Sequence, residues 1–270
     1  MGKKDKIIYL KSEEELEIIR NNGQILGKAH AEVAKIIEVG VTTKELDKVA
    51  HDYIKDNGGQ PSFLGLYGFP ASLCISINEV VVHGIPSNRV LKEGDIVSID
   101  GGVFKNNYHA DSAYTYTVGE VKSEVLELLK QTYKSLFKGI EQARTGNRIG
   151  DVSFAVQSYA EKFRYGVVRE LVGHGVGRHL HESPEVPNFG KRGNGAKLQE
   201  GMVIAIEPMI TLGRRGVVQE NDNWTIRTED RKQAAHYEHT VVVRKGNAEI
   251  LTTFQYIEEV LAKRNLFIAT

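Results

Sequence analysis

The start of the chain holds two stretches in which apolar positions recur at helical spacing, each behind a capping signal. Ser12 with Glu15 and Thr42 with Glu45 have the form of capping boxes, which mark helix N-termini. The apolar faces that follow are Leu16, Ile19, Leu26, Ala29, Val33 and Ile37 in the first stretch, and Leu46, Val49, Ala50, Tyr53 and Ile54 in the second. The pattern predicts two helices that open the chain.

Short apolar or alternating runs come next and predict strands at residues 73–77, 80–82, 96–100 and 112–118. Helical spacing then returns along a face made of Leu126, Leu129, Tyr133, Leu136 and Ile140, and again from about residue 151 to residue 163. Further strand-like runs follow, including residues 240–243. The order of helix, helix and strands therefore occurs twice.

The two passages also match residue by residue. Gly40, Glu45, Leu46, Val49 and Tyr53 match Gly146, Asp151, Val152, Ala155 and Tyr159 at an offset of 106, and residues 91–100 match residues 198–207 at an offset of 107. A Leu-x-Glu-Gly turn is common before a strand, so either match alone carries little weight. Together they indicate a duplication. We expect one domain, residues 1–270, whose halves at about 12–119 and 120–251 are related by a pseudo-twofold axis.

Both matching strand runs end in a carboxylate, Asp100 in one half and Glu207 in the other. An unpaired charge inside a core is costly or takes up a proton, so something must neutralise these groups. Asp111 and Glu238 each lead into a strand in a similar setting. Each carboxylate alone is more often a solvated or capping residue. Their symmetric placement favours a shared site in which two divalent cations cancel the four charges.

His174 is the natural histidine ligand, because it lies in the glycine-rich run GHGVG at residues 173–177. Carboxylates and imidazole without a thiolate suit Mn, Fe, Co or Zn. The run also resembles nucleotide-binding turns, but Leu180 stands where a dinucleotide fingerprint needs glycine. The chain has no serine elbow and no His-Glu-x-x-His sequence, so we expect a metal-activated water as nucleophile. At this point His83 and His181 stay unassigned, with a structural histidine as the alternative.

Composition excludes several classes of protein. Lys and Arg total 35, as do Asp and Glu, so no net charge directs the chain toward nucleic acid or an anionic membrane. The single cysteine, Cys74, rules out an internal disulfide framework and fits a reducing compartment. No apolar run is long enough to span a bilayer, and residues 1–6 lack the apolar stretch of a signal peptide. We therefore expect a cytoplasmic protein.

The residues resemble those of the type I methionine aminopeptidases from about Ser12 to Leu251. The motifs that carry the resemblance are NEVVVHGIP at 78–86, SID at 98–100, ADS at 110–112, GHGVG at 173–177 with His181, IEPM at 206–209, and YEHT at 237–240. That family has the pita-bread fold, an α/β (α+β) sandwich of pseudo-twofold halves with a curved antiparallel sheet flanked by helices. The resemblance implies removal of N-terminal methionine from proteins and peptides, with a small second residue preferred.

The resemblance also implies a set of five metal ligands. Asp111 and Glu238 should bridge two divalent ions, His174 and Glu207 should complete one coordination sphere, and Asp100 should chelate the other ion. A water or hydroxide between the ions would attack the scissile carbonyl. All five ligand positions are intact in this chain.

Three catalytic residues follow from the same resemblance. Glu207 should accept a proton, His181 should face the carbonyl oxygen, and His83 should lie near the scissile nitrogen or the substrate amine. The divalent ions would be Co, Mn, Fe or Zn. Whether a monovalent cation binds near Asn78 and Val80 is left open.

The methionine pocket of this family is built from a cysteine and aromatic residues. Cys74, Phe69 and Trp224 lie at matching positions. Leu66 and Leu180 stand where many members carry Tyr and Phe, which predicts a more aliphatic pocket. The alternative for these apolar residues, above all for Leu66, is plain core packing.

Other enzymes of this fold are the nearest alternatives. X-Pro aminopeptidases and prolidases share the five ligands but usually carry an additional N-terminal domain. A type II methionine aminopeptidase is disfavoured because only 25 residues separate His181 from Glu207, which leaves no room for a helical insertion. A non-catalytic module that binds peptides, histones or RNA is disfavoured by the intact ligands. The expected partners are nascent polypeptide N-termini near the ribosome, with no nucleic acid as substrate, no membrane, and a monomeric protein.

Overall fold

The structure is a computed structural model and describes residues 7–270. The signal-peptide argument concerns residues 1–6 and lies outside this range. Within residues 7–270, no helix combines the length and the apolar character that crossing a bilayer requires.

A pair of helices opens each half, as the sequence predicts. The helices are α1 (Glu13–Ile36), α2 (Thr43–Asp56), α3 (Ser123–Ile140), α4 (Ile149–Glu161) and α5 (Gln255–Lys263). Both predicted capping boxes are present, at Ser12 with Glu15 and at Thr42 with Glu45. The whole predicted apolar face of α1 is buried. The two opening helices therefore begin where their caps predict and pack through the faces that the spacing predicts.

The central sheet has nine strands, and all its pairings are antiparallel. Its order is β1-β4-β5-β14-β9-β7-β8, with β2 beside β4 and β15 beside β14. Its strands are β1 (Gln60–Pro61), β2 (Leu73–Ile77), β4 (Ile96–Lys105), β5 (Tyr108–Thr117), β7 (Val172–Gly175), β8 (Glu182–Pro187), β9 (Val203–Ile206), β14 (Glu238–Val242) and β15 (Glu249–Ile250).

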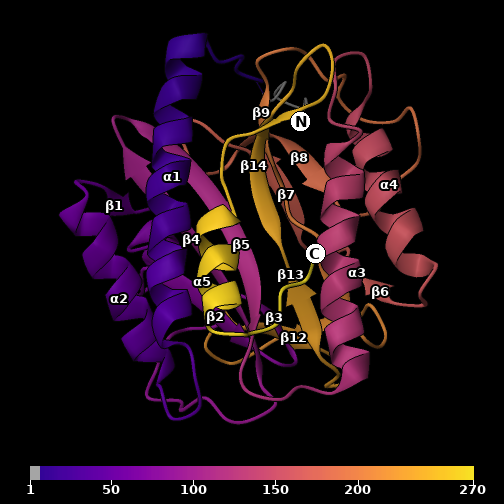
Figure 1. The fold of residues 1–270 in the computed structure, drawn as a ribbon. Coiled ribbons are helices and arrows are strands. Elements are labelled where there is room, and N and C mark those ends of the chain that lie inside the picture. The colour runs from indigo at the N-terminus through magenta and orange to yellow at the C-terminus, as the bar shows by residue number, and fades with distance from the viewer. Residues whose placement is uncertain (1–6) are drawn as a thin grey trace.

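Two three-stranded sheets lie beside the central one, in the orders β13-β10-β6 and β11-β12-β3. Their strands are β3 (Val80–Val82), β6 (Gly166–Val167), β10 (Met209–Thr211), β11 (Val217–Gln219), β12 (Ile226–Thr228) and β13 (Ala234–His236), and a short 3-10 turn, η1, spans Leu66–Gly68. Figure 1 shows α1, α5 and α3 side by side across one face of the central sheet. The expected α/β architecture of helices on an antiparallel sheet is confirmed.

The halves meet where β5 pairs with β14, and the duplication extends to backbone conformation. Gly40 and its match Gly146 have φ of 97° and 98°, and Gly94 and its match Gly201 have φ of 84° and 85°. Residues other than glycine rarely adopt these positive angles. Each half therefore uses glycine for the same turn before the second helix and again before the carboxylate-bearing strand.

Several predicted boundaries are wrong. The strand expected to end at Asp100 continues to Lys105, because β4 pairs with β5 along their whole length. Strand β5 begins at Tyr108 rather than 112, so Asp111 lies inside it, and β14 spans Glu238–Val242 rather than 240–243. Helix α4 spans Ile149–Glu161 rather than 151–163, since Asp151 is the third residue of a capping box and accepts a hydrogen bond from Arg148 N at 2.8 Å.

The duplication generates a stability prediction. Gly40→Ala and Gly146→Ala should each lower the free energy of unfolding by about 1 kcal/mol, because alanine is strained at positive φ. The two losses should be nearly equal, since a Cβ at either position meets no atom within 4 Å. Urea denaturation measures them. Gly246→Ala is the control, because Gly246 also has open space but no positive φ. Clearly unequal losses would contradict the structural equivalence of the two turns.

Candidate active site

Strand register brings the four predicted carboxylates to one face of the central sheet. Asp100 in β4 lies opposite Ala113 in β5, and Ala113 lies opposite Glu238 in β14. Asp111 is two residues before Ala113, so its side chain shares that face. Glu207 directly follows β9, the strand on the other side of β14. Each half of the sheet thus supplies two carboxylates to one place.

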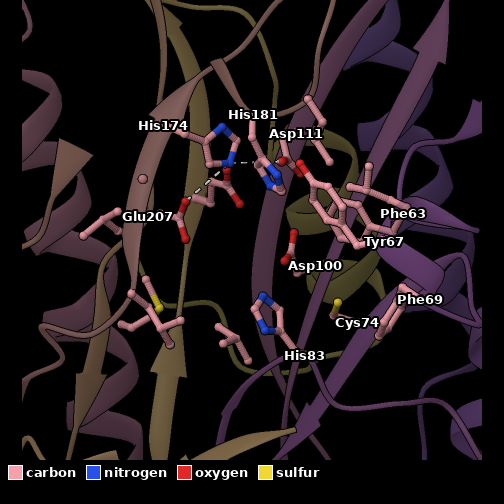
Figure 2. A pocket seen from close by; sticks show the side chains of 18 of the residues that line it. Phe63, Tyr67, Phe69, Cys74, His83, Asp100, Asp111, His174, His181 and Glu207 are labelled. Carbon is pink, nitrogen blue, oxygen red and sulfur yellow. Dashed lines mark ion pairs between the residues drawn. The ribbon is translucent and has the colours of Figure 1, made fainter. Parts of the chain in front are cut away.

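His174, in β7, completes this cluster. Its Nε2 lies 3.7 Å from Asp111 Oδ2 and 3.7 Å from Glu207 Oε1. Figure 2 shows the ring directed at both carboxylates, with Asp100 beneath them. One ligand atom from each of Asp111, His174 and Glu238 falls within 4.8 Å of the other two. The cluster therefore has the composition and spacing of a site for divalent cations.

The tautomer of His174 supports this assignment. Its Nδ1 lies 3.0 Å from the carbonyl oxygen of Gly175, which only accepts hydrogen bonds, so Nδ1 carries the proton. Burial lowers the pKa of His174 to about 3, so the ring is neutral near pH 7. Nε2 then presents a lone pair to two carboxylates. A cation between these three groups converts that repulsion into coordination.

The raised pKa values of the four carboxyl groups, and unpaired oxygens on three of them, also indicate a cation site. Burial raises the pKa of Asp111 to about 7. Burial, and then the charge of Asp111, holds the pKa of Asp100, Glu207 and Glu238 well above the usual range. The oxygens Asp100 Oδ1, Asp111 Oδ1 and Glu238 Oε1 are buried, and no atom of residues 7–270 makes a hydrogen bond to them. Bound divalent cations fit these unpaired oxygens.

The cluster forms one wall of a cavity of about 630 Å³, and apolar side chains form another. Every residue proposed for the methionine pocket lines this cavity: Leu66, Phe69, Cys74, Leu180 and Trp224. Phe69 and Trp224 pack edge to face with ring centroids 5.1 Å apart. Leu180 is 3% exposed, whereas Leu66 is half-buried at the margin of this apolar group. An apolar pocket therefore lies beside the carboxylates.

His83 and His181 lie between the cluster and the pocket. The rings of His181 and His174 are 4.4 Å apart, and Figure 2 shows His83 directed at Asp100 from below. His83 has a φ of 59°, a strained angle for a residue other than glycine. Burial lowers the pKa of both His83 and His181. Both rings are thus neutral near pH 7, so one nitrogen of each ring can donate a hydrogen bond and the other can accept one.

Sequence reasoning missed several residues of the site. His236 Nε2 is buried 3.9 Å from Glu207 Oε2, and Phe63, Tyr67 and Met209 also line the cavity. His236 had a signal in the sequence, because it stands only two residues before Glu238. Tyr67 had none. Its ring stacks 6.1 Å from that of His181, a contact made between segments far apart in the chain.

Comparison with known proteins agrees with this geometry. Residues 17–245 match metallopeptidase family M24. The chain is 49% identical over 247 residues to a methionine aminopeptidase of Clostridium acetobutylicum, a match that covers 91% of this chain and 99% of the relative. A solved methionine aminopeptidase of Thermotoga maritima superposes with a TM-score of 0.90 at 41% identity, over 92% of this chain and all of that one.

The prolidases, considered above as an alternative, are more distant. The structure of a prolidase from Pyrococcus horikoshii superposes with a TM-score of 0.74 at 25% identity, and the match covers 63% of that chain.

The clustered carboxyls predict how stability responds to metal and pH. In the metal-free protein at pH 8, Asp111→Asn should raise the melting temperature, because it removes a negative charge that is buried away from water. The pKa of Asp111 is raised from about 4 to about 7, so its ionisation destabilises the fold increasingly over this range and fully above it. The gain should therefore shrink as the pH falls toward 4.

The same variant should lose metal. Wild type should gain stability on the order of 3 kcal/mol at a metal concentration 100-fold above Kd, and Asp111→Asn should gain much less. Elemental analysis and thermal melts with and without chelator provide the measurements. A variant that keeps the wild-type metal content would overturn the assignment of Asp111 as a ligand.

Proposed function

The chain belongs to the methionine aminopeptidases of metallopeptidase family M24, and we propose that it removes N-terminal methionine from proteins and peptides whose second residue is small. The observation that carries the proposal is the cavity itself. A group of metal-ligating side chains and an apolar pocket with a sulfur atom and aromatic rings face the same space. A thioether owes its affinity to such contacts, so a methionine held there brings its peptide bond to the metal site.

We assign the metal ligands residue by residue. Asp111 and Glu238, from the two central strands, would hold two divalent ions together with His174 and Glu207 on one side and Asp100 on the other. Such ions would supply Lewis-acid chemistry to the scissile carbonyl and would lower the pKa of a water molecule. The candidate ions are Co, Mn, Fe and Zn, and a monovalent cation near Asn78 and Val80 remains part of the proposal.

Three side chains transfer protons or stabilise charge near the scissile peptide bond. Glu207 accepts the proton of the attacking water. His181 donates a hydrogen bond to the carbonyl oxygen as negative charge develops on it, which a neutral imidazole can do. His83 faces the substrate amine or the scissile nitrogen.

The side chain of methionine enters among Phe69, Cys74 and Trp224, with Leu66 and Leu180 narrowing the pocket. Leucine in place of aromatic rings gives the pocket flexible aliphatic walls that follow the shape of a linear thioether. We assign substrate binding to these five residues together with His83 and His181.

The proposal includes the setting in which the enzyme works. Residues 1–270 form one catalytic domain, monomeric and cytoplasmic, that acts on nascent chains near the ribosome. The internal halves at about 12–119 and 120–251 share the ligands, so neither half is active alone. Nucleic acid is not a substrate, and no membrane takes part.

Hydrolysis of defined peptides tests the proposal. After chelation, the protein should release free methionine from Met-Ala-Ser only when Co, Mn, Fe or Zn is restored, and should leave Ala-Pro peptides uncut. The apolar pocket accounts for the first result, and the small side chain of an N-terminal alanine, which cannot fill that pocket, accounts for the second. Cleavage of Ala-Pro in preference to Met-Ala-Ser would instead favour an X-Pro peptidase.

His174 and His181 provide a second test, because they lie close together but have different assigned roles. His174→Ala should lose metal and activity together. His181→Ala should keep its metal and its thermal transition but lose on the order of 100-fold in kcat, as when one donor to a developing oxyanion is removed. Loss of metal in the His181 variant, or a defect confined to KM, would contradict this division.

A further inference from the structure

A buried ion pair lies outside the metal cluster and joins the N-terminal segment to the segment that carries His181. Lys11 Nζ donates to Glu182 Oε2 at 2.6 Å, and the two side chains are 4% and 5% exposed. Glu182 is the first residue of β8 and directly follows His181. Lys11 does not line the cavity, whereas Glu182 does. The pair therefore connects a residue remote from the substrate to the residue next to His181.

Glu182 also holds the backbone on the other side of His181. Its second oxygen, Oε1, accepts a hydrogen bond from His179 N at 3.2 Å. One carboxylate thus contacts Lys11 and closes the turn of residues 179–182 around His181. The pair also packs against Gly177, where an added Cβ would lie 2.5 Å from Glu182 Oε1 and 2.6 Å from Lys11 Nζ. Gly177 therefore leaves no room for a side chain beside the pair.

Lys11 is itself fixed by the main sheet. Lys11 N donates to Gly201 O at 2.8 Å, in the turn that leads into β9. Strand β9 is followed by Glu207, one of the proposed metal ligands. A chain of contacts therefore runs from the β9 turn through Lys11 and Glu182 to residues 179–182, which include His181.

A buried ion pair adds little net stability, because the loss of hydration offsets the attraction. Its clearer effect is geometric, since moving either side chain away would leave a buried charge without a partner of opposite sign. A second link to the same segment, Arg178 to Tyr108 and Glu15, is more exposed, with the Arg178 side chain 68% exposed. Solvent screens such a link. The buried pair is therefore the stronger constraint on the turn.

We propose that Lys11 is a positioning residue for catalysis, which acts through Glu182 to hold His181 against the reacting carbonyl. This inference rests on the proposed function and deepens it. A side chain misplaced by about 1 Å can cost up to 100-fold in rate, so the effect of losing this constraint should be large. It should fall on kcat, since His181 acts mainly on charge that develops in the transition state.

The test compares Lys11→Met with Lys11→Arg in the metal-loaded enzyme acting on Met-Ala-Ser. Lys11→Met should lose roughly 10- to 100-fold in kcat, with KM and metal content near wild type. Lys11→Arg keeps the charge and should recover most of the rate. Arg244→Met is the matched control, because Arg244 ties the start of α1 to Glu249 without contacting residues 177–182. It should lower the melting temperature and leave kcat unchanged.

A double-mutant cycle separates positioning from a general loss of structure. Lys11→Met should lower the kcat of wild type but should have almost no further effect on His181→Ala, because the residue that it positions is already gone. An equal effect in both backgrounds, or a wild-type kcat in Lys11→Met, would overturn the proposal. If Lys11→Met does not fold, the double variant Lys11→Met/Glu182→Gln leaves no buried charge unpaired and takes its place in the cycle.

Hydrogen exchange tests the constraint without any assay of activity. Lys11→Met should speed exchange at the amides of residues 177–182, and Arg244→Met should not. Unchanged exchange in Lys11→Met would overturn the proposed constraint. If exchange does increase while His181→Ala turns over normally, the role of His181 in the proposed function fails and Lys11 loses its catalytic role with it.

Discussion

Repulsion among buried carboxyl groups is the constraint on which this structure depends. Asp100, Asp111, Glu207 and Glu238 share one face of the central sheet, where burial raises the pKa of each. No Lys or Arg ion pair to any of the four occurs within residues 7–270. Their charges must be cancelled by protons or by cations. Divalent ions bound there would therefore contribute to the stability of the fold as well as to the chemistry.

The duplication explains how so unfavourable a cluster is assembled. Neither half contains more than two of the carboxylates, so neither half-sheet alone concentrates four charges. They come together only when β5 pairs with β14. At that junction Thr240 Oγ1 donates to Asp111 O at 2.8 Å and accepts from Asp111 N at 3.1 Å, which fixes the register beside the cluster. These hydrogen bonds between uncharged groups of β5 and β14 hold the carboxylates close enough together to bind cations.

The sequence predicted correctly those elements whose formation depends on residues close together in the chain. Both capping boxes and the apolar face of α1 depend on residues within a few turns of one another. The repeat also predicted the paired strands and carboxylates, because Gly94 and Gly201 mark the same turn in each half. The ends of β4 and β5 were missed because the partner strand decides how far a strand runs. Helix α5 was missed although Ile257, Val260 and Leu261 recur at helical spacing in its sequence.

At the rim of the site, spacing and repeats alone left His83 and His181 unassigned, and only the family resemblance supplied their roles. The proposed ligands come from strands or, for Glu207, from the residue after one, so a repeat in the strands reveals them. The groups that would face substrate lie on connections instead: His83 after β3, His181 before β8, and Tyr67 in the η1 turn. Their proximity depends on contacts such as that of Tyr67 with His181 or of Lys11 with Glu182, 171 residues apart. Connections tolerate more variation than strands do. The arrangement therefore lets the recognition of substrate change while the metal cluster stays fixed on the sheet.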